Sequence, residues 1–147
     1  MVAKNLYTIG YEGLSPEAFL SKLRANNVDV VIDVREVPHS RKRGFSKSHL
    51  DTQLTGAGIS YLNFRELGSP APARKQYKED GDFVAFSLSY AEVLRAERAT
   101  LEGLYSLAAE RDCCLLCYEA DAETCHRSLV GAAVAGLNGG GFTVIHL

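Results

Sequence analysis

The chain has 147 residues, of which 46% are hydrophobic and 23% charged, and its formal net charge is −2. This length suits one domain with one core, and we expect residues 1–147 to form a single α/β domain. The near-neutral charge gives no general attraction to nucleic acid or membranes, so any basic site must be local. No apolar run approaches the roughly 20 residues of a spanning helix, and the N-terminus lacks a signal-peptide profile. We therefore expect a cytoplasmic protein with no membrane partner.

The first half of the chain predicts three strands and two helices. Residues 6–9 are a short apolar run that ends at Gly10, which is typical of a strand. Ser15 as N-cap and Pro16 at the first helical position predict a helix over 16–27. Residues 28–34, VDVVIDV, have the nearly continuous apolar pattern of a strand buried on both faces. A short helix over 46–58 and a strand over 58–64 follow.

The second half predicts two more strands. Residues 63–82 contain Pro70, Pro72 and many charges without an apolar period, and we expect a long loop there. Residues 83–111 predict helix in two pieces, 113–119 a strand, 125–137 a helix with Thr124 as N-cap, and 142–147 a last strand. This alternation predicts a three-layer α/β fold: a mainly parallel sheet of about five strands with helices on both faces.

Polar residues gather where the predicted strands end. In open α/β sheets, ligands bind at the carboxyl ends of the strands, so these positions are the candidate site. Asp33 is the site residue or the acceptor that anchors the next loop, and Glu119 is a general base, a partner that orients His126, or a surface glutamate. The candidate catalytic residues are Cys125, His126, Glu119 and Asp33, and the candidate anion-binding residues are Arg35, Arg41, Arg43 and Arg127.

Cys125, His126 and Arg127 fall at the start of a predicted helix. Unpaired backbone N–H groups and the positive end of the helix dipole lie there, which lowers a thiol pKa and attracts anions. Arg127 can bind a phosphate or carboxylate with two hydrogen bonds. The alternative is that Cys125 is half-buried and inert, with His126 and Arg127 in structural ion pairs with Glu119 or Asp121.

The other three cysteines favour a structural interpretation. Cys114 and Cys117 have the spacing of a zinc knuckle, but residues three apart in a strand point to opposite faces. We therefore predict no metal site, and we expect Cys113, Cys114 and Cys117 to be small core residues. All four cysteines crowd into residues 113–125, unlike a disulfide framework, which favours reduced thiols.

The segment from Arg35 to His49 is locally basic. It contains five basic residues and one acidic residue, a net charge of +4. This charge favours a patch for phosphates or a nucleic-acid backbone, although a solvated basic loop is an alternative.

Several motifs in this order resemble one family over nearly the whole chain, from Tyr7 to about His146. They are TIGYEG, DVREVPHSRKRGFSK, LxxxLxxxGISY, RELGSP and LLCYEADAETCHR, and the most specific pieces are Asp-Val-Arg with the following Pro-x-Ser-Arg and the Cys-x(7)-Cys-His-Arg passage. They resemble the domain-of-unknown-function family DUF488. The resemblance implies an α/β domain and no established activity.

Three functions fit these observations. The first is an enzyme without a cofactor that acts on a phosphate-bearing or nucleotide-like anion at the carboxyl rim. The second is a nucleic-acid-binding module for DNA or RNA processing, which uses residues 35–49 and has no catalysis of its own. The third is a structural or partner-binding domain without chemistry.

Overall fold

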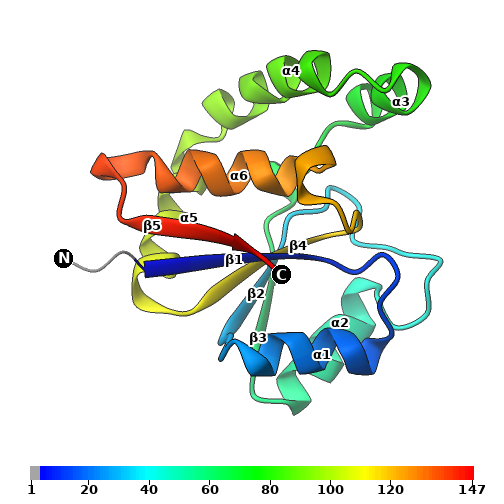
Figure 1. The fold of residues 1–147 in the computed structure, drawn as a ribbon, viewed down its shortest axis with the longest axis vertical. Coiled ribbons are helices and arrows are strands. Elements are labelled where there is room, and N and C mark those ends of the chain that lie inside the picture. The colour runs from blue at the N-terminus through cyan, green and yellow to red at the C-terminus, as the bar shows by residue number, and fades with distance from the viewer. Residues whose placement is uncertain (1–3) are drawn as a thin grey trace.

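A computed structural model describes residues 4–147 as one sheet of five parallel strands flanked by helices (Figure 1). The strands are β1 (Lys4–Gly10), β2 (Val30–Asp33), β3 (Ser60–Asn63), β4 (Cys113–Cys117) and β5 (Phe142–His146). Their order across the sheet is β3-β2-β4-β1-β5, and every neighbouring pair is parallel. The predicted three-layer α/β fold is therefore confirmed.

Two helices cover one face of the sheet, α1 (Pro16–Ala25) and α2 (Lys47–Gly56). The Ser15 side chain caps α1 by accepting a hydrogen bond from the Ala18 backbone N–H at 3.1 Å, and Pro16 occupies the first turn, as the sequence predicts. Buried leucine and phenylalanine side chains of these helices pack on β2 and β4 in one hydrophobic cluster: Phe19, Leu23, Leu50, Leu54, Val31, Cys114 and Leu116.

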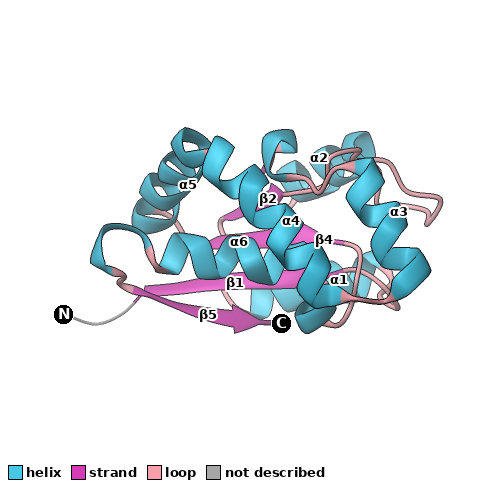
Figure 2. Cartoon of the chain, turned by 90° about the horizontal axis from the view of Figure 1, so that it is seen from above, coloured by secondary structure: helices cyan, strands magenta, loops and turns pink. Residues whose placement is uncertain are grey.

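Helices α4 (Phe83–Ala96), α5 (Arg98–Glu110) and α6 (His126–Ala135) belong to the opposite face. Figure 2 shows α4 and α6 on the near side of the strands when the molecule is seen from above. Their apolar side chains form a second cluster with the other face of β2 and β4: Phe86, Tyr90, Leu101, Leu104, Val130, Val134, Val30, Ile32, Leu115 and Cys117. Cys114 and Cys117 point to opposite faces, as period-two alternation requires.

The central strand β4 lies at the point where the chain changes faces. The connections that leave β1 and β2 pass over the α1 and α2 face, whereas the connection that leaves β4 passes through α6 on the other face. Since β4 lies between β2 and β1, the loops after these strands diverge and leave a crevice at their carboxyl ends.

The predicted loop over 63–82 is wrong in part, because residues Ala71–Asp80 form helix α3. Pro70 is its N-cap, Pro72 lies in its first turn, and Gly81 ends it in the left-handed conformation at φ 65°. No residue of α3 is fully buried, and only Ala73 and Tyr77, one turn apart, pack in part against the second cluster. This apolar stripe is too short for periodicity to predict the helix. Among residues 4–147, no helix has the length and apolar character to cross a membrane.

Candidate functional site

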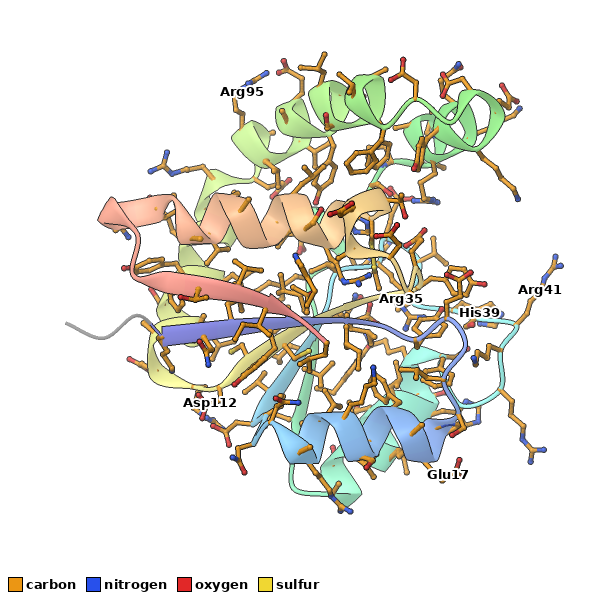
Figure 3. All side chains as sticks on the ribbon, in the orientation of Figure 1. Glu17, Arg35, His39, Arg41, Arg95 and Asp112 are labelled. Carbon is orange, nitrogen blue, oxygen red and sulfur yellow. A yellow bond between two sulfur atoms is a disulfide. The ribbon has the colours of Figure 1, made fainter. Side chains whose placement is uncertain are left out.

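A cleft of about 830 Å³ opens at the carboxyl ends of β1, β2 and β4. Loops after these three strands form its inner wall, and α3 with part of α4 closes one side. The side chains that line the cleft include Tyr11, Arg35, Glu36, His39, Arg41, Arg74, Lys75, Tyr77, Lys78, Phe86, Cys117, Tyr118, Glu119, Cys125 and His126. Figure 3 shows Arg35 close to the strand ends, whereas Arg41 reaches outward from the loop after β2. Arg35, Arg41, Glu119, Cys125 and His126, which the sequence analysis names as candidates, all line this cleft.

Two sulfur atoms lie on the inner wall of this cleft. Cys117 is the last residue of β4, Cys125 immediately precedes α6, and the structure joins them by a disulfide. Both residues are buried, at 1% and 2% exposure. The sequence predicts that Cys117 is a core residue and that all four thiols are reduced. The burial of Cys117 is as expected, whereas its pairing with Cys125 corrects the expectation of reduced thiols. The loop of eight residues after β4 turns back, and this return path is not encoded by any local periodicity.

Cys125, and not Thr124, is the N-cap of α6. Thr124 instead ends a short 3₁₀ turn, Ala122–Thr124, that precedes it. The Arg127 backbone N–H donates to Cys125 Sγ at 3.5 Å, so the sulfur occupies the place that a serine or aspartate oxygen takes in an ordinary N-cap. Cys125 Sγ therefore lies at the positive end of the α6 dipole, as the sequence predicts for this segment.

His126 is buried next to Cys125 in a fixed orientation. Its Nε2 lies 2.7 Å from the carbonyl oxygen of Val34. Since that oxygen can only accept, Nε2 carries the proton, and Nδ1 of the neutral ring has a free lone pair. Nδ1 lies 3.8 Å from Cys125 Sγ. Burial lowers the pKa of His126 below its ordinary value, so the neutral ring is the form present at pH 7.

Arg127 has a different environment from the one expected of an anion ligand, because it is fully buried. Its Nε donates to Thr8 Oγ1 at 3.1 Å, and its two terminal nitrogens donate to the carbonyls of Glu119 and Ala120. One of these nitrogens also donates to Cys117 Sγ at 3.1 Å. The guanidinium thus holds the β4–α6 loop against β1 and contacts the sulfur pair.

Asp33 and Arg35 form a buried ion pair beside the cleft. The Asp33 carboxylate accepts from Arg35 Nε at 2.8 Å and from its terminal nitrogen at 2.7 Å, and it also accepts from the Tyr61 hydroxyl at 2.5 Å. The other terminal nitrogen of Arg35 donates to the Tyr11 hydroxyl at 3.1 Å. Asp33 is fully buried and does not line the cleft, whereas Arg35 is 8% exposed and does.

Glu119 follows β4 and lies beside the sulfur pair. The Cys117 Sγ is 3.5 Å from its Oε2, and burial raises the pKa of Glu119 above its ordinary value. One oxygen of Glu119 and the two sulfurs lie within 4.8 Å of one another, a donor set that a soft metal accepts. We assign no metal ligand among them, because the two sulfurs are bonded to each other.

The cleft wall also carries cations outside the candidate residues predicted from the sequence. Arg74, Lys75 and Lys78 belong to α3 and line the cleft together with Arg41, whereas Arg43 does not line it. The unrecognised helix explains the omission, since residues 74, 75 and 78 share one side only when the segment is helical. A basic residue cluster next to two prolines in an otherwise polar tract is the signal that points to them.

Comparison of the chain with protein-family models identifies one family. The family model described as "Domain of unknown function DUF488" matches residues 15–134, a span that includes every candidate residue named from the sequence. No curated protein and no solved structure matches the chain.

Proposed function

The chain belongs to the DUF488 family, whose description assigns no activity, and we propose that it is a cysteine-dependent enzyme that acts on an anionic substrate. Cys125 in its reduced form is the nucleophile. One observation carries this proposal: Cys125 Sγ lines a basic cleft and is contacted both by a backbone N–H of α6 and by Nδ1 of His126.

The immediate surroundings of Cys125 favour its thiolate. The Arg127 N–H and the α6 dipole stabilise negative charge on Sγ, and the lone pair on His126 Nδ1 can accept the thiol proton. The hydrogen bond to the Val34 carbonyl holds the His126 ring in the required tautomer. In this proposal Asp33 and Arg127 hold neighbouring residues in place and do not contact the substrate, because their side chains are fully buried and bonded to other residues.

The charges of the cleft favour an anionic substrate. Arg41, Arg74, Lys75 and Lys78 outnumber Glu36 and Glu119 along its walls, which favours an anion. The rings of Tyr77, Phe86 and Tyr118 also line it and offer a surface for an apolar or planar group. A phosphate-bearing or carboxylate-bearing molecule with a flat body, such as a nucleotide, fits this combination.

The decisive experiment is alkylation of Cys125 in the Cys117→Ser variant, in which no disulfide can form. Lowering a thiol pKa from about 8.5 to about 6.5 raises its thiolate fraction at pH 7 from about 3% to about 75%. We expect iodoacetamide to modify Cys125 about tenfold or more faster at pH 7 than it modifies a free thiol, and the apparent pKa to rise in the additional variant His126→Ala. A Cys125 that titrates as an ordinary thiol would rule the proposal out.

The charge of the reagent provides a second readout. Iodoacetate carries the negative charge that iodoacetamide lacks, so the basic cleft should shift the rate ratio towards iodoacetate relative to the same ratio for free cysteine. Replacement of Arg74 and Lys78 by glutamate should abolish the shift. An unchanged ratio would show that the cleft does not select anions.

Nucleic-acid binding without catalysis is the second candidate. It is favoured by one observation: α3 lies on the same cleft as the loop after β2, so its cations extend the basic segment 35–49. A contiguous basic surface is the footprint expected for a phosphate backbone.

A further inference from the structure

We infer that Cys117 and Cys125 are a reversible dithiol–disulfide couple that exchanges with a carboxylate-bearing organic disulfide in the basic cleft, with Cys125 attacking and Cys117 resolving. The inference rests on the proposed function for the nucleophilic role of Cys125. The inference goes beyond the proposed function in three ways. It assigns Cys117 a chemical role, it names a disulfide bond as the bond that is broken in the substrate, and it names a two-electron exchange as the reaction.

The two cysteines are held close together at the wall of the cleft. Cys117 ends the central strand and Cys125 starts a helix that packs on the sheet, so two rigid elements hold the sulfurs together. Their sequence separation is eight, and closing so short a loop costs little entropy. Both side chains line the cleft, so a molecule bound there meets the pair directly.

Arg127 contacts both members of the pair. Its backbone N–H donates to Cys125 Sγ at 3.5 Å, and its guanidinium donates to Cys117 Sγ at 3.1 Å. In thiol–disulfide exchange the attacking sulfur is a thiolate, and a donor at each sulfur stabilises Cys125 in the first attack and Cys117 in the second. A purely structural disulfide has no need of such donors.

Cys113 and Cys114 lack this arrangement. Both are fully buried free thiols, and neither lines the cleft. Burial raises the pKa of Cys113 to about 11 and raises that of Cys114 as well. The chain therefore separates its four cysteines into one pair in the cleft and two thiols in the core.

The exchange is balanced as follows. Cys125 gives its proton to His126 Nδ1, and the thiolate attacks one sulfur of a disulfide RSSR. The S–S bond breaks, and RS⁻ leaves and takes up the proton from His126. Cys117 then transfers its proton to the Glu119 carboxylate, whose Oε2 lies 3.5 Å from Sγ, and attacks the sulfur of Cys125. The second RS⁻ leaves and takes up that proton. Two thiols are oxidised to the Cys117–Cys125 disulfide while RSSR is reduced to two RSH, and a thiol reductant reverses the reaction.

The charge of the cleft selects among disulfides. Arg41, Arg74, Lys75 and Lys78 attract carboxylates and repel ammonium groups. An anionic disulfide is therefore preferred to a cationic one of similar size, and the preference should weaken with salt because the cations are at the cleft wall and in contact with solvent.

The test uses the whole chain, fully reduced, with glutathione disulfide as the anionic probe and cystamine as the cationic probe. Mass spectrometry of acid-quenched samples follows three species: the dithiol, the mixed disulfide and the internal disulfide. We expect the dithiol of the wild type to be oxidised to the internal Cys117–Cys125 disulfide. We expect glutathione disulfide to react about tenfold or more faster than cystamine at low salt, relative to their rates with free cysteine.

Variants identify the two roles. Cys117→Ser should stop at a stable mixed disulfide on Cys125, and Cys125→Ser should form none on Cys117. Cys114→Ser, a change in the core on the other sheet face, should react as the wild type does. If the Cys117→Ser variant does not fold, Cys117→Ala takes its place. The measurement on the wild type tests the inference even if neither variant folds.

The outcomes separate the inference from the proposed function. If Cys125 alkylates fast in Cys117→Ser but the wild type accumulates mixed disulfide without resolving it, the resolving role of Cys117 is refuted and the proposed nucleophile remains. A wild type that forms the internal disulfide equally fast with both probes refutes the selection of anionic disulfides. Slow alkylation of Cys125 refutes the proposed function and the inference together.

Discussion

Gly10 lies against the carbonyl oxygen of Glu119 so closely that a Cβ at position 10 would be 1.7 Å from that oxygen. Gly10 ends β1 and Glu119 follows the neighbouring strand β4, so this contact fixes how the two loops leave the sheet. The same Cβ would be 2.8 Å from a terminal nitrogen of Arg127. The close approach of two backbones therefore shapes the wall on which the sulfur pair lies.

We expect Gly10→Ala to lower the free energy of unfolding by about 1–3 kcal/mol, because backbone atoms must move to admit the methyl group. Urea denaturation measures the change. Gly103→Ala is the matched control, since a Cβ at this exposed position in α5 meets no atom within 4 Å. Alanine should stabilise that helix by up to about 1 kcal/mol. A neutral Gly10→Ala would contradict the contact.

The buried ion pair of Asp33 and Arg35 gives a second prediction. Asp33→Asn removes the charge that faces the Arg35 guanidinium and should cost about 3–5 kcal/mol of stability, because an unpaired buried cation remains. Tyr61→Phe removes only one hydrogen bond to the same carboxylate and should cost about 1 kcal/mol. Denaturant unfolding of both variants compares the losses, and equal losses would argue against a stabilising ion pair.

Arg127 should matter for stability as much as for chemistry. Arg127→Met keeps much of the side-chain volume but removes the hydrogen bonds of the guanidinium to the buried Thr8 Oγ1 and to the partly buried carbonyls of Glu119 and Ala120. A hydrogen bond to a charged group contributes about 1.5–3 kcal/mol, so the loss of several of them should lower the midpoint of thermal unfolding strongly. Arg43→Met changes an exposed arginine and should stay within about 0.5 kcal/mol. Similar midpoints for the two variants would contradict the structural role.

The alternative function of nucleic-acid binding is tested with a fluorescent single-stranded oligonucleotide. If the basic cleft binds the phosphate backbone, affinity should fall steeply with salt and about tenfold or more in Arg74→Glu with Lys78→Glu. Lys22→Glu with Arg24→Glu makes the same charge change on exposed positions of α1, away from the cleft, and is the matched control. Absence of binding at low salt would remove this alternative.

The core cysteines should be inert in the folded protein. The raised pKa of Cys113, about 11, leaves about one thiol in a thousand ionised at pH 8, and burial also blocks access. Native alkylation at pH 8 followed by peptide mapping should therefore leave Cys113 and Cys114 unmodified, and both should react after unfolding in urea. Modification of either at the rate of a free thiol would contradict the burial.

Local patterns in the sequence were sufficient for much of the fold. The apolar run of residues 28–34 predicted β2, and Ser15 with Pro16 predicted the start of α1, because these signals depend only on neighbouring residues. The rule that ligands gather at the carboxyl ends of strands placed Arg35, Glu119, Cys125 and His126 on one rim, and the cleft is lined by all four.

Only the tertiary structure decided which of these side chains meet. Helix α3 packs on the core only in part, through Ala73 and Tyr77, so the sequence has no apolar periodicity that predicts the helix or the shared side of its cations. Arg127 was expected to face a ligand, but the path of the β4–α6 loop buries it among carbonyls. The Cys117–Cys125 pair depends on the same return of the chain. A sequence determines which residues favour a strand end or a helix start, whereas distances between such ends depend on how whole elements pack.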